Sequence, residues 1–303
     1  MPIATRNSAF AAAALAVTLL AAVTSCSSGT DGSRDSDSKL LQGLDALAED
    51  SGTEQVTYLD VAKARQLSKG DAKRFAVIGL PGSSLVDSPM PAPWGQHLDV
   101  SQIDIAVDTP KAGHWEGSFD AAAIAKALKS NGYRQREEDG NRVWKHPDTS
   151  VATFEISQDE ISYSALDANP MSAVSPKEGA SLADNQDYQR AAECLGDMYR
   201  ADFGPFVSAK PVRLSVLGQQ AASASKNTEI LCFLAKDEAT ADRLATKMRS
   251  IVKAKSPDFD GTKVSVEKGD RPFVRAIVPD SASQPPGRLL RTDVDLWLAM
   301  HDI

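Results

Sequence analysis

The chain has 303 residues, with 33 Lys and Arg against 41 Asp and Glu, so its formal net charge is −8. With 42% hydrophobic and 24% charged residues it resembles an ordinary soluble globular protein, which excludes a collagen, a low-complexity disordered chain and a polytopic membrane protein. The acidic balance argues against a nucleic-acid partner, because neutralising phosphates requires a clustered basic face.

The first 25 residues have the pattern of a signal peptide. Arg6 supplies positive charge, and an apolar run follows from Ala9 to Val23. As a helix this run is about 22 Å long, whereas the hydrocarbon core of a bilayer is roughly 30 Å thick. We therefore expect a cleaved signal peptide over residues 1–25 rather than a membrane span.

The apolar run ends in Val23-Thr24-Ser25-Cys26, which resembles the lipobox of bacterial lipoproteins. The resemblance implies cleavage before Cys26 and transfer of a diacylglyceryl group to its sulfur. The membrane would then be a partner through diacylglyceryl-Cys26, because two acyl chains, at about 0.8 kcal/mol per buried CH₂, anchor stably. An ordinary secretory signal with a cysteine near the cut is the alternative. Residues 26–38 are Ser-rich and predict a flexible tether.

Beyond the tether, periodicity predicts a first unit over residues 39–166. We expect a surface loop rich in Pro and Gly over residues 79–95, with Trp94 as its anchor. Asp139-Gly140 predicts the turn of a hairpin. The expected helices cover residues 40–47, 61–68 and 119–128, and the expected strands cover residues 56–59, 103–107, 133–137, 141–146, 151–157 and 161–166.

A second unit is expected over residues 181–303, after a polar linker rich in turn formers at residues 167–180. The order of strand, helix and hairpin recurs in it, with a hairpin turn at residues 268–270. The expected helices cover residues 185–199, 237–255 and 287–300, and the expected strands cover residues 229–235, 262–267 and 272–278.

The predicted fold class is therefore α+β, with two units in which helices pack on one face of an antiparallel sheet. Residue identity between the two halves is negligible. Divergent duplication and coincidence both remain open, as does the question whether the two units share one sheet.

Cys194 and Cys232 are the two cysteines of the predicted globular part. An exported chain keeps disulfides, so we expect these two to be bonded, a bridge that contributes about 4 kcal/mol in the chain-entropy model. Two buried free thiols are the alternative. Either role is structural, because the chain lacks the Cys-x-x-Cys spacing of redox sites.

The sequence offers no catalytic, metal-binding or cofactor motif. The four histidines lack the spacing of a zinc site, so no metal is expected. The segment GLPGSS at residues 79–84 lacks the Lys of a phosphate loop, and Ser83 does not stand in a G-x-S-x-G motif. We expect no cofactor, no catalytic residues and no enzymatic activity.

One segment is a candidate contact surface: the loop from Pro89 to His97, which includes Trp94. A Trp in such a loop serves either as a packing anchor or as part of a binding surface. The sequence alone leaves both roles open.

The lipobox, the Ser-rich tether and the segment SLADNQDYQRAAECLGD at residues 181–197 resemble actinobacterial surface lipoproteins of uncharacterised function. The resemblance implies a location at the cell membrane, lipid-anchored on the extracytoplasmic face, and carries no catalytic residues. We expect a non-enzymatic binding or scaffolding module whose partner is an unknown envelope protein or a small ligand. A solute- or lipid-binding lipoprotein serving a transporter is the alternative, and a cell-envelope hydrolase is the third reading.

Overall fold

The structure is a computed structural model that describes residues 38–49, 55–75, 78–83, 85, 92–138, 140–165, 170–204, 211–280 and 286–298. Residues 37–303 group into one compact unit. The expected signal peptide, Cys26 and the tether up to residue 37 lie outside the described residues. Among the described residues, no helix is both long enough and apolar enough to cross a bilayer.

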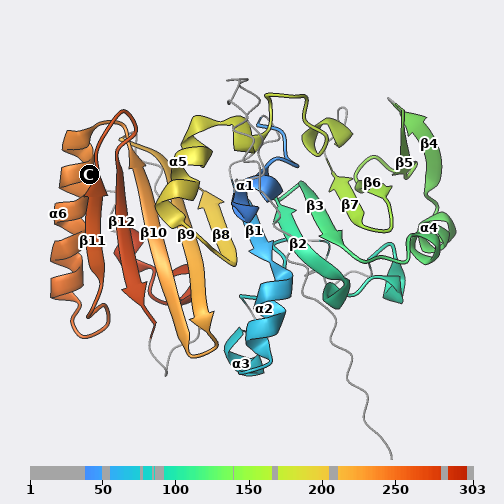
Figure 1. Ribbon diagram of the computed structural model, residues 1–303. Coiled ribbons are helices and arrows are strands. Elements are labelled where there is room, and N and C mark those ends of the chain that lie inside the picture. Colours follow the sequence, from blue (N-terminus) through green and yellow to red (C-terminus); the bar gives the residue numbers. More distant parts are fainter. Residues whose placement is uncertain are drawn as a thin grey trace, which may run out of the picture. The chain divides into compact units, whose positions relative to one another are not determined.

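Within the part of the chain that the structure describes, the centre of this unit is a sheet of 12 strands, all paired antiparallel (Figure 1). The strand order is β11-β12-β10-β9-β8-β1-β2-β3-β7-β6-β5-β4. The strands are β1 Val56–Asp60, β2 Ile103–Asp108, β3 Ala112–Gly117, β4 Arg134–Glu138, β5 Asn141–Lys145, β6 Thr153–Ile156, β7 Glu160–Ser164, β8 Arg200–Gly204, β9 Val212–Ser223, β10 Lys226–Ala235, β11 Lys263–Glu267 and β12 Phe273–Pro279.

The two halves of the chain meet where β1 pairs with β8. Strands β1 to β7 lie on one side of this junction and β8 to β12 on the other. Both halves therefore share one sheet, and the combination of helices with an antiparallel sheet confirms the α+β class. The finer division into units 39–166 and 181–303 stays a prediction.

The helices lie on both faces of the sheet, so the expectation of helices on one face is wrong. In β10, Ile230 and Cys232 pack in the cluster that holds α5, whereas Leu231 and Phe233 pack in the cluster that holds α6. Successive residues of a strand point to opposite faces of the sheet. A strand that is covered on both faces therefore has a continuous apolar sequence. The helices are α1 Lys39–Leu44, α2 Val61–Ser68, α3 Ala72–Phe75, α4 Ala121–Ser130, α5 Gln186–Leu195, α6 Glu238–Ala254, α7 Arg288–Arg291 and α8 Asp295–Leu298.

Local sequence signals place the starts of the longer helices. Asp60, Asp120, Asn185 and Asp237 each accept a hydrogen bond from a backbone N–H of the first turn of α2, α4, α5 and α6. At the other end of α4 the chain turns at Gly132 with a φ of 89°. These caps agree with the expected starts of α2, α5 and α6, whereas α4 begins at Ala121, two residues after the expected start at residue 119.

Three strands and one break were not predicted. β3, β8 and β9 were absent from the expected elements, and β3 contains Gly113 and Gly117, which are uncommon in strands. A Cβ at Gly117 would lie 2.1 Å from the carbonyl oxygen of Gln102, so close backbone packing requires a glycine there. The single helix expected over residues 287–300 is wrong, because two short helices, α7 and α8, are separated near Thr292.

Part of the expected linker is packed in the core. The 3-10 helix Pro170–Ala173 buries Met171, and Val174 follows it into the cluster around α1 and α5. The backbone N–H of Ala48 donates to the carbonyl oxygen of Ala173 at 2.9 Å. Residues 170–174 therefore belong to the folded unit.

Candidate functional site

The structure forms the expected disulfide between Cys194 and Cys232, with an Sγ–Sγ distance of 2.05 Å. Cys194 lies on the face of α5 that covers the sheet, and Cys232 lies on the facing side of β10. Both residues are fully buried. The bond therefore fixes α5 on the sheet and is structural, as expected.

Trp94 is buried within the aromatic core rather than displayed on the surface. Its ring makes edge contacts with Trp115 and Phe154, with centroid distances of 5.8 and 5.7 Å. His97 closes the following 3-10 helix, Gly95–His97, and is exposed. The structure thus supports the anchor reading for Trp94, and residues 89–91 of the candidate contact loop lie outside the described residues.

An open groove of about 580 Å³ runs between residues 94–97 and α4. The loop is held beside the helix because the Asn131 Nδ2 donates to the carbonyl oxygen of Pro93 at 2.8 Å. The groove is lined by Trp94, by small residues and by a few polar or charged ones. These residues are Trp94, Gly95, Gln96, His97, Ala123, Lys126, Ala127, Ser130 and Asn131.

A row of polar residues crosses the middle of the sheet. The register places Tyr163 beside Gly113, Gly113 beside Asp108, Asp108 beside Thr57, and Thr57 beside Asp202. We call Asp108, Thr57, Asp202 and Tyr163 the polar row. It joins four strands, and Thr57 links the two halves because its hydroxyl donates to Asp202 Oδ1 at 3.1 Å.

Asp108 is the centre of the polar row, and its residue is only 2% exposed. Its Oδ1 accepts from the Trp115 Nε1 and from the Tyr163 hydroxyl, both at 2.8 Å. Burial raises the pKa of Asp108 from 3.8 to about 6, although these two donors, the Gly82 amide and the charge of Arg200 lower it. Loss of hydration therefore outweighs the stabilising contacts of the anion.

Gly113 permits the contact between Tyr163 and Asp108. A Cβ at this position would lie 2.5 Å from Asp108 Oδ1 and 2.6 Å from the Tyr163 hydroxyl. Any side chain would therefore separate the two groups. Burial and the neighbouring Asp108 raise the pKa of Tyr163, so its hydroxyl stays protonated and donates.

The sequence places Ser83 in a loop and does not indicate which residues it contacts. Ser83 was expected in a surface turn, but it is 1% exposed and its Oγ lies 2.7 Å from the Tyr163 hydroxyl. It also accepts a hydrogen bond from the Leu85 backbone N–H at 3.1 Å. No local motif connects Ser83 with Asp108 and Tyr163. Strand pairing through β3 brings Asp108 and Tyr163 together, and tertiary packing places Ser83 against them.

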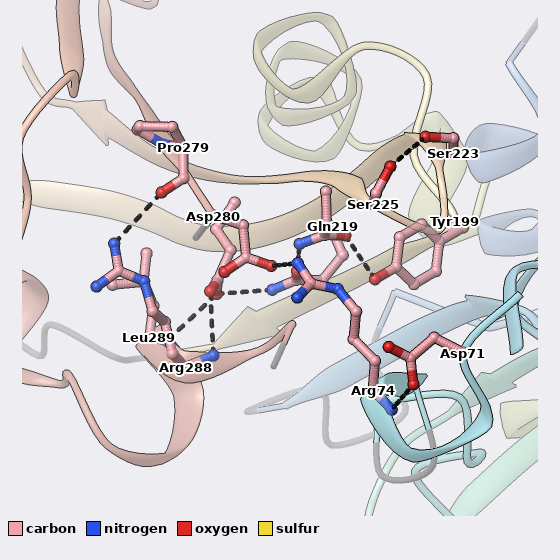
Figure 2. A network of polar contacts seen from close by, with 12 residues as sticks. Asp71, Arg74, Tyr199, Gln219, Ser223, Ser225, Pro279, Asp280, Arg288 and Leu289 are labelled. Carbon is pink, nitrogen blue, oxygen red and sulfur yellow. Dashed lines mark hydrogen bonds and ion pairs between the residues drawn. The ribbon is translucent and has the colours of Figure 1, made fainter. Parts of the chain in front are cut away.

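A second buried polar network lies in the C-terminal half (Figure 2). The Tyr199 hydroxyl donates to Asn227 Oδ1 at 2.9 Å, and Asn227 Nδ2 donates to Gln219 Oε1 at 3.1 Å. Gln219 Nε2 then donates to Glu229 Oε2 at 2.8 Å. These three hydrogen bonds form a series in which each donor points towards the carboxylate of Glu229, which is fully buried.

Glu229 also caps the first turn of α7. Its Oε1 accepts from the backbone N–H of Arg288 at 3.0 Å and its Oε2 from that of Leu289 at 3.3 Å. Burial nevertheless raises the pKa of Glu229 from 4.5 to about 7, with Asp280 adding to the rise and Gln219 opposing it. This network connects β9, β10 and α7 and has the character of a structural core.

The three histidines among the described residues, His97, His114 and His146, do not gather at a site. His114 Nδ1 lies 2.8 Å from Ser162 Oγ, and burial lowers the pKa of the ring. His146 contacts the ring of Tyr133 and His97 lines the groove. Within the described ranges, no group of three or more His, Cys, Asp or Glu side chains is placed to hold a metal ion.

Comparisons of the chain with protein-family models, with curated proteins and with solved structures found no match.

Proposed function

We propose that the chain is a lipoprotein anchored at the extracytoplasmic face of the cell membrane, where it acts as a non-enzymatic binding or scaffolding module. The observation that carries this proposal is the fully buried disulfide between Cys194 and Cys232. Such structural disulfides persist in oxidising compartments and are rare in the cytosol. This agrees with the export and lipidation implied by the lipobox-like segment that ends at Cys26.

Anchoring is tested by lipid labelling and fractionation of the full chain. In a bacterial host, the wild type is expected to incorporate a labelled palmitate analogue and to fractionate with membranes. Cys26→Ala removes the sulfur that would be acylated, so it is expected to lose both properties. The control, Cys194→Ala with Cys232→Ala, keeps Cys26 and is expected to stay labelled. Unlabelled wild-type protein in the medium contradicts the proposal.

The groove between residues 94–97 and α4 is the surface we propose for binding an envelope protein. Its two walls are held together by the bond from Asn131 to Pro93, so the surface is preformed. Gln96 and Lys126 are exposed on opposite walls. Trp94, which also lines the groove, is fixed in the core by its ring contacts with Trp115 and Phe154.

Photo-crosslinking at single positions tests this surface in cells. A crosslinking residue at Gln96 or at Lys126 is expected to capture the same envelope protein. Thr246, an exposed residue of α6, is the matched control and is expected to give no adduct with it. Equal capture at all three positions, or none at the groove, contradicts the assignment.

The other readings predict different observations. A solute- or lipid-binding lipoprotein would retain a small ligand in native mass spectrometry. A cell-envelope hydrolase would turn over ester, peptide or glycan substrates. Either result with the full chain would replace the scaffolding proposal.

A further inference from the structure

Residues 78–83 form a short segment, here called the strap, that lies over the polar row of the sheet. Arg200 Nη1 donates to the carbonyl oxygens of Ile78 and Leu80, both at 3.1 Å. Arg200 is itself fixed by two hydrogen bonds of 2.8 Å to the carboxylate of Asp202. The strap is therefore bound to β8 through one well-positioned guanidinium.

The second half of the strap is bound through Asp108 and Tyr163. The Gly82 amide stabilises the Asp108 carboxylate, and a Cβ at Gly82 would lie 3.0 Å from the Thr57 side chain. Ser83 Oγ lies 2.7 Å from the Tyr163 hydroxyl. Backbone and hydroxyl contacts thus hold the strap directly against the polar row.

The strap keeps water from Asp108. Asp108 is 2% exposed. Ile78 and Ser83, the first and last residues of the strap, are 3% and 1% exposed. The groups around the Asp108 carboxyl are the Trp115 N–H, the Tyr163 hydroxyl, the Gly82 amide and the charged pair of Arg200 with Asp202. The burial cost exceeds the sum of these contacts, which is why the closed site favours the neutral acid.

We propose that the strap is a pH-dependent latch, closed over neutral Asp108 in mild acid and released more readily once Asp108 is ionised. Lifting the strap returns the Asp108 carboxylate to water, which stabilises the ionised form and leaves the neutral form almost unaffected. Opening is therefore linked to loss of the proton. This inference rests on residues 78–83 and the polar row and does not depend on anchoring through Cys26.

The expected change in the opening equilibrium follows from the difference between the pKa of Asp108 with the strap closed and with the strap open. The pKa of Asp108 is about 6 with the strap closed and returns towards 3.8 in contact with water. A shift of about two pH units changes an equilibrium by about 100-fold. The opening equilibrium is thus expected to rise by up to about 100-fold between pH 4 and pH 8, with most of the change above pH 5.

Hydrogen exchange of the full chain tests the latch. Protection of the strap peptide, corrected for the intrinsic pH dependence of exchange, is expected to fall as the pH rises, relative to a peptide from residues 121–130 of α4, which contains no acidic residue. Asp108→Asn cannot ionise, so its strap protection is expected to be constant between pH 5 and 8. The matched control, Glu229→Gln, removes a buried acid that lies outside the strap and the polar row, and it is expected to keep the wild-type strap profile.

Tyr163→Phe gives an independent check. It removes a hydrogen bond that stabilises the Asp108 anion, so the midpoint of the wild-type transition is expected to move to higher pH. If Asp108→Asn does not fold, the pH dependence of strap protection in the wild type and in Tyr163→Phe still tests the latch. A wild-type strap profile without pH dependence, or the same slope in Asp108→Asn, overturns the proposal.

Discussion

Arg74 and Asp280, which are 206 positions apart in the chain, form a buried ion pair with an Nη2–Oδ2 distance of 2.7 Å (Figure 2). Their side chains are 8% and 1% exposed. Arg74 lies in α3 of the first half, and Asp280 follows β12 at the end of the second. The pair therefore connects the two halves of the chain beside the Glu229 network.

Arg74→Ala is expected to lower the free energy of unfolding by about 3–5 kcal/mol, because it removes the guanidinium that is paired with the buried Asp280 carboxylate. Urea denaturation at pH 7 measures the change. Lys255→Ala is the matched control, since its partner Asp295 and Lys255 itself are about half exposed, and it is expected to cost less than about 1 kcal/mol. Equal effects of the two variants would show that burial does not govern the Arg74 pair.

Removing the disulfide is expected to destabilise the protein by about 4 kcal/mol. The bridge joins residues separated by 38 positions, and closing a loop of this size restricts the unfolded chain. Cys194→Ala with Cys232→Ala is compared with the wild type by urea denaturation, with and without a reductant. The reductant is expected to lower the stability of the wild type alone. Two thiols titrating in the unreduced wild type would contradict the bond.

The ionisation of Glu229 is expected to make the protein less stable as the pH rises. Its pKa is about 7 in the folded protein and near 4.5 when exposed, so the folded state binds the proton more tightly. The stabilisation is fully present below pH 4.5 and is lost as the pH rises through about 7. The loss attributable to this group is about 3 kcal/mol.

The measurement for Glu229 is the free energy of unfolding at several pH values between 4.5 and 8. Glu229→Gln is expected to flatten the decline, and the exposed control Glu178→Gln is expected to follow the wild type. The slope is the decisive quantity, because Glu229→Gln also changes hydrogen bonds with Gln219 and Leu289 at every pH. An unchanged slope in Glu229→Gln would contradict the raised pKa.

Trp94 and His97 are expected to behave oppositely although they are three residues apart. Trp94→Ala removes a buried ring packed on Trp115 and Phe154, so it is expected to cost about 3–5 kcal/mol of stability. His97→Ala changes an exposed side chain and is expected to alter stability by less than about 0.5 kcal/mol. Thermal and urea denaturation measure both. A large loss for His97→Ala would show that it supports the fold rather than the groove surface.

Much of the local structure was predictable from the sequence. The starts of α2, α4, α5 and α6 follow from Asp or Asn caps before apolar residues at helical spacing. The hairpin between β4 and β5 follows from the glycine at 140, whose φ is 86°. The pairing of Cys194 with Cys232 follows from a count of two cysteines in the globular part. Each of these depends on neighbouring residues or on elimination.

The candidate site was only partly predictable. Residues 94–97 were expected as a contact surface, but α4 as the other wall of the groove follows from packing alone. Asp108 and Tyr163 stand in ordinary strand patterns, and nothing near either in the sequence marks a buried acid or its donor. Gly113 was expected outside any strand, yet the absence of its side chain is what permits their contact.

The sequence by itself determined the composition class, the helix caps, the hairpin turns and the cysteine pair, because these depend on short-range preferences. Only the tertiary structure decided that one sheet joins both halves, that helices cover both its faces, and that a strap covers Asp108. The contact of Thr57 with Asp202 spans 145 positions, and its formation depends on the pairing of β1 with β8. Such pairing is selected by burial of the whole sheet, a property that no segment carries alone.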